Sequence, residues 1–476
     1  MSHKKPVTRR DFLSQSLLST GSLVVLPSLY TMLAARRAFG ADACTAVAQN
    51  SKTSFICIDL AGGANIAGSN VMVGKQGGQL DFLSAYDKLG LPSAMNPQMA
   101  AQTSNELGLT FHADSAMLRG IRSITSATTR ANVDGVVFCT QSNDDTGNNP
   151  TNPMYWIAKS GLTGTLTALA GTSSSITGGN STAPSMSINP AARPIRLASP
   201  SDARNLVSLG QLNVLFPPNK IDSIMAAIEG MSSSHLAAFQ EKDLPTQILD
   251  VLGCNYTKSR AVAQDGPDAY DPLKDPMVAQ IFPNLMNSTS DQQVATVAKL
   301  VLDQVAGGGT IQKGGYDYHS GNRSDGETAD FAAGVAIGQC LELAAKKGKD
   351  LMLYVFTDGG ISSSATVDNS TGGRGKLAWA GDSGERSASF MLLYRAGNGR
   401  PSLRNNLRQV GYFVDGGQAV DTKSSLIATD VNMQAMAVVL NYLALDGSES
   451  KLGDVIGDAD PFTGVTDKYL LFNKLG

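Results

Sequence analysis

The chain contains few of the residues from which common catalytic and nucleic-acid-binding sites are built. Of its 476 residues, four are histidines, 17% are charged and 6% are aromatic. It has no Gly-x-Ser-x-Gly, Gly-Lys-Ser/Thr or His-Glu-x-x-His stretch, which excludes the usual serine-hydrolase elbow, phosphate loop and zinc-protease helix. Gly359-Gly360 alone is too short for a dinucleotide-binding loop, so we predict no nucleotide or flavin cofactor.

Cysteines are also scarce. There are five, and none forms a Cys-x-x-Cys pair, which argues against a zinc ribbon or a thioredoxin-like centre. Cys57, Cys139 and Cys340 lie within apolar patterns that are typical of buried thiols. Cys44 and Cys254 lie in polar stretches, and they either form a disulfide in an oxidising compartment or stay free, since spacing alone cannot fix the pairing.

The first 40 residues have the pattern of an export signal. Thr8-Arg9-Arg10-Asp11-Phe12-Leu13 precedes an apolar run over residues 17–33, and Ala38-Phe39-Gly40 provides a small-residue exit. This pattern resembles a bacterial twin-arginine signal, which delivers folded proteins across the inner membrane. We therefore expect cleavage before Ala41. The alternative is an uncleaved membrane anchor, which Pro27 and the many hydroxyl residues of the run disfavour.

Cleavage would make the mature chain acidic and leave it without a stable membrane anchor. Residues 1–40 hold six Lys or Arg and one Asp, so the net charge becomes −8 after their removal. No basic run remains, and nucleic-acid binding loses its electrostatic basis. We expect an exported protein, in the periplasm or on the cell surface, whose one predicted partner is the twin-arginine translocation machinery.

The mature chain has the pattern of a single α/β domain over residues 41–476. Near-continuous apolar runs at 54–60, 133–140, 351–357 and 389–394 predict strands that are covered on both faces, as in a mainly parallel sheet. Helical periodicity over 329–347 and 432–445 predicts flanking helices. Residues 171–185 and 361–376 are predicted loop insertions.

Polar residues follow several of these apolar runs. Asp59 and Asp358 come at strand ends, and Asp317 and His319 lie two residues apart in the stretch Gly-Gly-Tyr-Asp-Tyr-His at 314–319. Ligands of open α/β sheets bind beyond the carboxyl ends of the strands. We therefore predict that Asp317, His319 and Asp358 hold one divalent cation, of unknown identity.

The same stretch resembles the Gly-Gly-Trp-Asp-Thr-His motif of a twin-arginine-exported bacterial family of unknown function, which is similar in fold to sulfatases and alkaline phosphatases. The resemblance continues in order at residues 60–65, 149–152, 356–360 and 438–446. It implies an alkaline-phosphatase-like sandwich, and for this superfamily a site with two metals and a Ser or Thr nucleophile. Thr151 is the residue that this implies as the nucleophile.

Departures from the family pattern imply an eroded metal site, in which several of the superfamily's ligands are replaced. Asn65 and Asn152 stand where the family has aspartate and histidine, and Asp382-Ser383-Gly384 stands where Asp-His-Gly is usual. After the signal only His112, His235 and His319 remain, too few for two zinc ions. The resemblance therefore implies one cation and hydrolysis of phosphate or sulfate esters. The alternative is a non-catalytic binding or assembly protein that uses the remnant cleft.

Each candidate residue also has a structural interpretation. Asp317 and His319 could form a hydrogen-bonded turn pair, and Asp358 could anchor the loop after its strand. Thr151 lies in Pro-Thr-Asn-Pro, which is equally an ordinary turn. We expect His112 to be a hydrogen-bonded structural histidine and Asp144 and Asp145 to be solvated or capping residues.

Overall fold

The computed structural model describes residues 52–143, 150–184, 193–207 and 265–476 apart from 321, 398 and 406–407, together with 220, 223–224, 226–227 and 230. Several predictions of the sequence fall outside the described residues: the signal over 1–40, Cys44, Asp144, Asp145, His235 and Cys254. Within the described part of the chain, no helix has the length and apolar character needed to cross a bilayer.

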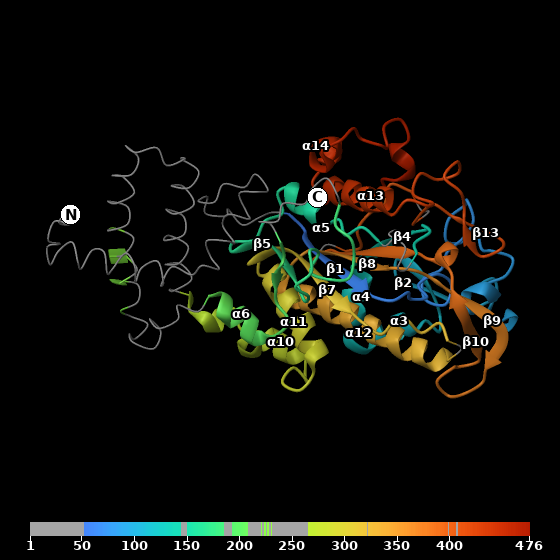
Figure 1. The fold of residues 1–476 in the computed structure, drawn as a ribbon, viewed down its shortest axis with the longest axis horizontal. Coiled ribbons are helices and arrows are strands. Elements are labelled where there is room, and N and C mark those ends of the chain that lie inside the picture. Colours follow the sequence, from blue (N-terminus) through green and yellow to red (C-terminus); the bar gives the residue numbers. More distant parts are fainter. Residues whose placement is uncertain are drawn as a thin grey trace, which may run out of the picture.

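An eight-stranded sheet lies at the centre of the structure (Figure 1). In their order across the sheet, the strands are β12 (Gln409–Val410), β4 (Val133–Phe138), β11 (Ser389–Tyr394), β8 (Leu351–Thr357), β1 (Ser54–Leu60), β7 (Ala306–Lys313), β5 (Thr167–Gly171) and β6 (Ile195–Arg196). All of them run parallel except β11, which is antiparallel to both of its neighbours. The predicted α/β class with a mainly parallel sheet is confirmed.

The reversed strand β11 follows from its connection. After β8 the chain forms an antiparallel hairpin of β9 (Ile361–Asp368) and β10 (Lys376–Asp382), and the pairing of Asp382 with Ile361 returns it to the edge where β8 ended. Only residues 383–388 separate β10 from β11. Because no helix crosses back to the other edge, β11 must run opposite to β8. Residues 361–376, predicted as a loop insertion, thus contain β9, the turn of the hairpin and the first residue of β10.

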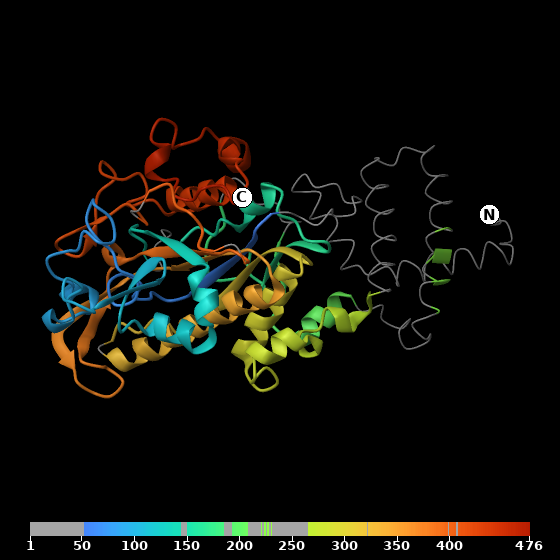
Figure 2. The ribbon, with the colours of Figure 1, turned by 180° about the vertical axis from the view of Figure 1, so that it is seen from behind.

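Alternate residues of the strands face two different helical layers. Phe55 and Cys57 of β1 pack with α5 (Met154–Lys159), α13 (Val431–Ala444) and α14 (Leu452–Ile456). Ile56 and Ile58 pack on the other face with α3 (Ala116–Ile124), α10 (Pro276–Ile281), α11 (Thr289–Leu302) and α12 (Arg323–Lys347). The two layers are seen on opposite sides of the sheet in Figure 1 and from behind in Figure 2. Burial on both faces explains why these strands are apolar throughout.

The helices begin and end at residues with the expected capping chemistry. Asn322 accepts a hydrogen bond from the Ser324 amide at the start of α12, and Asp430 caps α13 in the same way. Gly348 ends α12 in the left-handed conformation. The helices predicted over 329–347 and 432–445 are therefore confirmed, with α12 starting six residues earlier.

The remaining described elements are smaller and lie around this sandwich. Apart from short 3-10 helices, they are β2 (Thr103–Leu107), β3 (Leu109–His112), α4 (Ala127–Ala131), α6 (Pro200–Leu206), β13 (Phe413–Val414) and β14 (Gln418–Ala419).

Candidate metal centre at the carboxyl edge of the sheet

The segment 314–319, which connects β7 to α12, turns two polar side chains to the same side. Tyr316 and Tyr318 are 1% and 5% exposed, whereas the side chains of Asp317 and His319 are 64% and 36% exposed. Successive side chains of an extended segment point in opposite directions. Burial of the two tyrosines therefore places Asp317 and His319 together on the outer side.

Both tyrosines are fixed to α12 by their hydroxyl groups. Tyr316 Oη donates to the Ala329 carbonyl at 2.9 Å, and Tyr318 Oη donates to Asp330 Oδ1 at 2.7 Å. Tyr318 Oη also accepts a hydrogen bond from the Asn65 amide at 2.8 Å. Burial raises the pKa of Asp330 to about 7, although its hydrogen bonds with Tyr318 and Asn70 oppose this rise. The loop is thus held by buried polar contacts that leave the outer side chains available.

The turn after β1 supports this loop from below. Gly62 has a φ of +114°, and a Cβ atom at this position would lie 2.8 Å from the backbone nitrogen of Asp317. Only glycine combines this backbone conformation with such a close approach. Since the Tyr316 amide also donates to the Ala61 carbonyl at 3.3 Å, the end of β1 fixes the position of Asp317.

The β9–β10 hairpin brings a third polar side chain to the same place. Trp379 of β10 packs on Tyr318 with ring centroids 5.7 Å apart, and the Arg323 guanidinium lies 4.1 Å from the Trp379 ring centroid. These contacts align the end of β10 with the 314–319 segment. As a result Asp382, the last residue of β10, lies beside His319.

Asp317, His319 and Asp382 form a group with the geometry of a metal centre. His319 Nδ1 lies 2.6 Å from Asp317 Oδ1 and 3.1 Å from Asp382 Oδ1, and one ligand atom from each residue lies within 4.8 Å of the other two. Ligand atoms about 3 Å apart are expected around one cation whose bonds are about 2.1 Å long. The three residues could therefore hold a single divalent cation.

One atom of this group lacks an ordinary partner. His319 Nδ1 is shielded from solvent and makes no hydrogen bond of acceptable geometry, despite its short distances to two carboxylate oxygens. A shielded nitrogen without a hydrogen bond is costly, and a cation between it and the carboxylates would satisfy it. The donor set of one imidazole and two carboxylates fits the predicted cofactor.

Asp358 lies near this group but has a different set of partners. Its Oδ1 accepts hydrogen bonds from the Gly62 and Gly63 amides at 2.6 and 3.1 Å, and its Oδ2 accepts one from Asn180 Nδ2 at 3.0 Å. Asp358 therefore anchors the turn that supports Asp317, and Asp382 completes the metal group in its place. The sequence signal for Asp382 was its position in the Asp-Ser-Gly segment that resembles Asp-His-Gly.

A second buried carboxylate fixes the loop after β5. Asp59 Oδ2 accepts hydrogen bonds from the Asn180 and Ser181 amides at 2.6 and 2.9 Å. Burial raises the pKa of Asp59 to about 6, and the nearby Asp358 carboxylate adds to this rise. Asn180 thus binds Asp59 through its backbone and Asp358 through its side chain, so that residues 172–184 are fastened to the carboxyl edge of the sheet.

Thr151 lies at the start of α5 and is 2% exposed. Its hydroxyl donates to Asn432 Oδ1 at 2.6 Å, at the start of α13. The neighbouring Asn152 binds Thr310 Oγ1 and Ser181 Oγ at 3.0 and 3.3 Å, so this segment does approach the loop that Asp59 holds. No described hydrogen bond links Thr151 to the metal group, and its role as a nucleophile stays a prediction.

His112 has the structural role expected for it. The residue is fully buried, with Nε2 3.1 Å from the Met95 carbonyl and Nδ1 accepting from the Asp114 amide at 3.2 Å. Burial lowers the pKa of His112 to about 4, and the positive charge of Lys376 contributes to this. The ring is therefore neutral, with its proton on Nε2.

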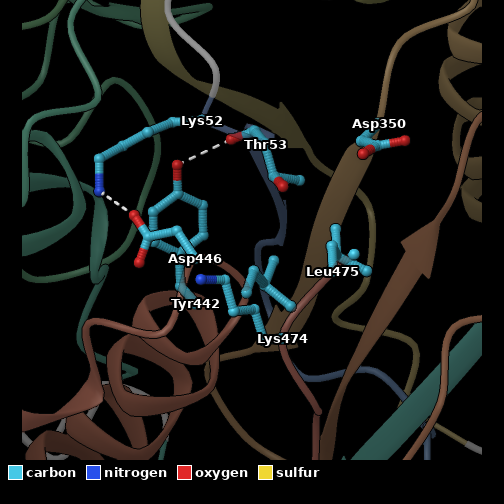
Figure 3. A pocket seen from close by; sticks show the side chains of 9 residues that line it. Lys52, Thr53, Asp350, Tyr442, Asp446, Lys474 and Leu475 are labelled. Atoms are coloured by element: carbon cyan, nitrogen blue, oxygen red, sulfur yellow. Dashed lines mark hydrogen bonds and ion pairs between the residues drawn. The ribbon is translucent and has the colours of Figure 1, made fainter.

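A separate hollow lies at the opposite, amino edge of the sheet (Figure 3). Lys52 and Asp446 form an ion pair of 2.6 Å there, and Tyr442 Oη donates to the Thr53 carbonyl at 2.7 Å. Asp350, on the far side of the hollow, accepts from the Ala396 amide. The first two contacts join the segment before β1 to α13 and the residues that follow it, and the hollow contains none of the predicted site residues.

Comparison with known proteins adds no assignment. No protein-family model matches the chain, and no curated protein matches its sequence. The resemblance to the twin-arginine-exported family therefore stays a prediction.

Proposed function

We propose that the protein is exported and holds one divalent cation through Asp317, His319 and Asp382, at which phosphate or sulfate esters bind and are hydrolysed. The observation that carries this proposal is the convergence of three ligand atoms around the shielded His319 Nδ1. The proposed alkaline-phosphatase-like architecture is consistent with a mainly parallel sheet whose polar groups gather beyond the carboxyl ends of β1, β7 and β8.

The three residues have distinct parts in this site. His319 offers a neutral nitrogen ligand, and the two carboxylates bring the negative charge that retains a divalent cation. More than half of the Asp317 and Asp382 side-chain surface is exposed, which leaves one side of the group open to a ligand from solution. A cation bound there would act as a Lewis acid on an ester oxygen.

A second function, ester binding without hydrolysis, is favoured by the contacts of Thr151. Its hydroxyl proton is donated to Asn432, whereas a nucleophile needs a base that accepts this proton during attack. Under this alternative the protein keeps the cation and its ligand affinity but lacks turnover.

Elemental analysis and activity assays of protein purified from the periplasm separate the possibilities. The variants are His319→Ala, Asp382→Asn and, as a matched control, Asp467→Asn, which removes an exposed carboxylate from a short helix near the chain end. We expect one equivalent of metal in wild type and control, and loss of metal in the two site variants.

The assay with aryl phosphates and aryl sulfates then assigns the function. Turnover that is lost together with the metal supports hydrolysis. Stoichiometric metal with no turnover supports the binding function instead. Protein that is free of metal after incubation with Mn²⁺, Zn²⁺ and Ca²⁺ would contradict both.

A further inference from the structure

A polar hollow of about 480 Å³ lies between the β2–β3 hairpin and the segment that carries Arg400 and Arg408. Thr103, Asn105 and Thr110 line it from the hairpin. It lies near the start of β4, where Arg408 reaches Asp134, and therefore at the opposite edge of the parallel sheet from the metal group. Its volume is within the range of small-ligand sites.

Positive charge exceeds negative charge around this hollow. Arg408 forms a bidentate pair with Asp134 through Nε and Nη2 at 2.8 and 3.0 Å. Glu106 is shared by Arg122 and Arg130. Arg400 has no carboxylate within ion-pair distance among the described residues, and its Nη2 donates only to the Glu106 carbonyl at 2.9 Å. Four guanidinium groups thus lie close to two carboxylates, and two of the four, Arg400 and Arg408, line the hollow.

Arg400 is the member of this cluster that forms no ion pair among the described residues. Its Nη1 is shielded from solvent and makes no hydrogen bond, because it lies against Gly108, where a Cβ atom would come within 2.4 Å. Burial lowers the pKa of Arg400, and repulsion from Arg408 adds to this, although attraction to the nearby Asp134 carboxylate opposes it. Arg400 shares its nearest carboxylate, Asp134, with Arg408, and a partly buried cation with only a shared carboxylate is stabilised by an accompanying anion.

The backbone at Arg408 also departs from its ordinary range. Its φ is +49°, in the left-handed region that costs a non-glycine residue free energy. Arg408 in this conformation binds Asp134 through Nε and Nη2. Its third nitrogen, Nη1, takes no part in that pair. Strained residues that hold a charged group at a hollow are typical of ligand sites.

We propose that this hollow binds a tetrahedral oxyanion, a phosphate or sulfate group, between the guanidinium groups of Arg400 and Arg408. Guanidinium groups bind such oxyanions through paired N–H···O bonds, and the hairpin hydroxyl and amide groups of Thr103 and Asn105 complete the rim. The anion would pair with Arg400, whose nearest carboxylate, Asp134, forms its ion pair with Arg408. This site is separate from the metal group and does not depend on its function.

Calorimetric titration of the mature chain in a buffer without multivalent anions tests this proposal. We expect saturable binding of inorganic phosphate or sulfate with a Kd below about 1 mM, and binding weakened at least about tenfold in Arg400→Ala. Arg404→Ala is the matched control, because Arg404 lies in the same segment but already pairs with Glu449. With the cation removed by a chelator from both proteins, His319→Ala should bind phosphate as wild type does, which distinguishes this hollow from the metal group.

Thermal unfolding without added anion gives a second readout. We expect Arg400→Met to unfold at the same temperature as wild type or higher, since it removes a partly buried charge that forms no ion pair. Phosphate should raise the Tm of wild type but not of this variant. Equal phosphate affinity in wild type and Arg400→Ala, or no saturation below about 10 mM, would overturn the proposal. A large loss of stability in anion-free Arg400→Met would do the same, because it would make the guanidinium a structural group.

Discussion

At the residue scale, the position of Asp317 depends on the absence of a side chain at Gly62. We predict that Gly62→Ala lowers the free energy of unfolding by about 1–3 kcal/mol, because it combines an unfavourable φ with a Cβ atom 2.8 Å from the Asp317 nitrogen. It should also weaken cation binding without removing any ligand. Gly314→Ala is the control, since its Cβ would meet nothing within 4 Å. Chemical unfolding measures the stability of the two variants, and calorimetry measures their Mn²⁺ affinity. Equal values in both would show that Gly62 does not lie close to the Asp317 backbone.

A pH prediction follows from Asp59. Its pKa of about 6 in the folded protein lies above the ordinary 3.8, so the folded state binds the proton more tightly than the unfolded state. The contribution of Asp59 to the free energy of unfolding is therefore highest below about pH 4. It decreases by at most about 3 kcal/mol as the pH rises to about 6. In Asp59→Asn the part of the decrease in unfolding free energy that comes from Asp59 should be absent. In Asp467→Asn it should remain. Urea unfolding from pH 4 to 7 measures the difference, and parallel curves for wild type and Asp59→Asn would contradict the shift.

The sequence predicted only some of the residues of the candidate metal centre. Asp317 and His319 could be found because they alternate with two tyrosines in one short segment. Asp358 was assigned to the cation because it ends an apolar strand, but its carboxylate is bonded to the Gly62 and Gly63 amides. Asp382 depends on the register of β9 and β10, which spacing along the chain does not reveal.

At the element scale, close packing of α3 against α12 requires glycine. A Cβ atom on Gly334 would lie 2.0 Å from the Met117 carbonyl oxygen of α3. We predict that Gly334→Ala lowers the free energy of unfolding by at least about 2 kcal/mol, although alanine is intrinsically the better helix former. The exposed Ala332→Gly is the control and should cost about 1 kcal/mol through helix propensity alone. A Gly334→Ala protein that is more stable than wild type by urea unfolding would show that the helices are not in this contact.

Glycine also explains which strands the sequence did not reveal. The runs that became β1, β4, β8 and β11 are apolar because helices cover both faces. In contrast β7 contains Gly307, Gly308 and Gly309, and a Cβ atom on Gly309 would lie 2.5 Å from Val297 of α11. Because α11 packs directly against the backbone of β7, this central strand needs no side chains there. Its composition is therefore that of a loop.

At the scale of the whole molecule, the two proposed sites lie at opposite edges of one sheet. The metal group lies beyond the carboxyl ends of the parallel strands, and the arginine hollow lies near the amino end of β4. Open α/β sheets bind their ligands outside the carboxyl ends of the strands, in the crevice where the strand order reverses. Polar residues at the strand ends predicted a site at the carboxyl edge. The arginine hollow brings together residues nearly 300 positions apart, so no local sequence pattern indicates it.

Export is the second prediction at the scale of the whole molecule. We predict that changing Arg9 and Arg10 together to Lys retains the precursor in the cytoplasm, since the twin-arginine machinery discriminates against this conservative replacement. Fractionation followed by immunoblotting measures the precursor and the mature form. Replacement of Lys4 and Lys5 with Arg is the control and should leave export intact. Normal delivery of the double lysine variant would show that another route carries the protein.

The central claim is that Asp317, His319 and Asp382 hold one cation together. Anomalous diffraction from a crystal soaked in Mn²⁺ tests this most directly. We predict a single strong anomalous peak within about 2.3 Å of His319 Nδ1 and one oxygen of each carboxylate, absent from a His319→Ala crystal. Strong Mn²⁺ peaks elsewhere with none between these three side chains would contradict the claim.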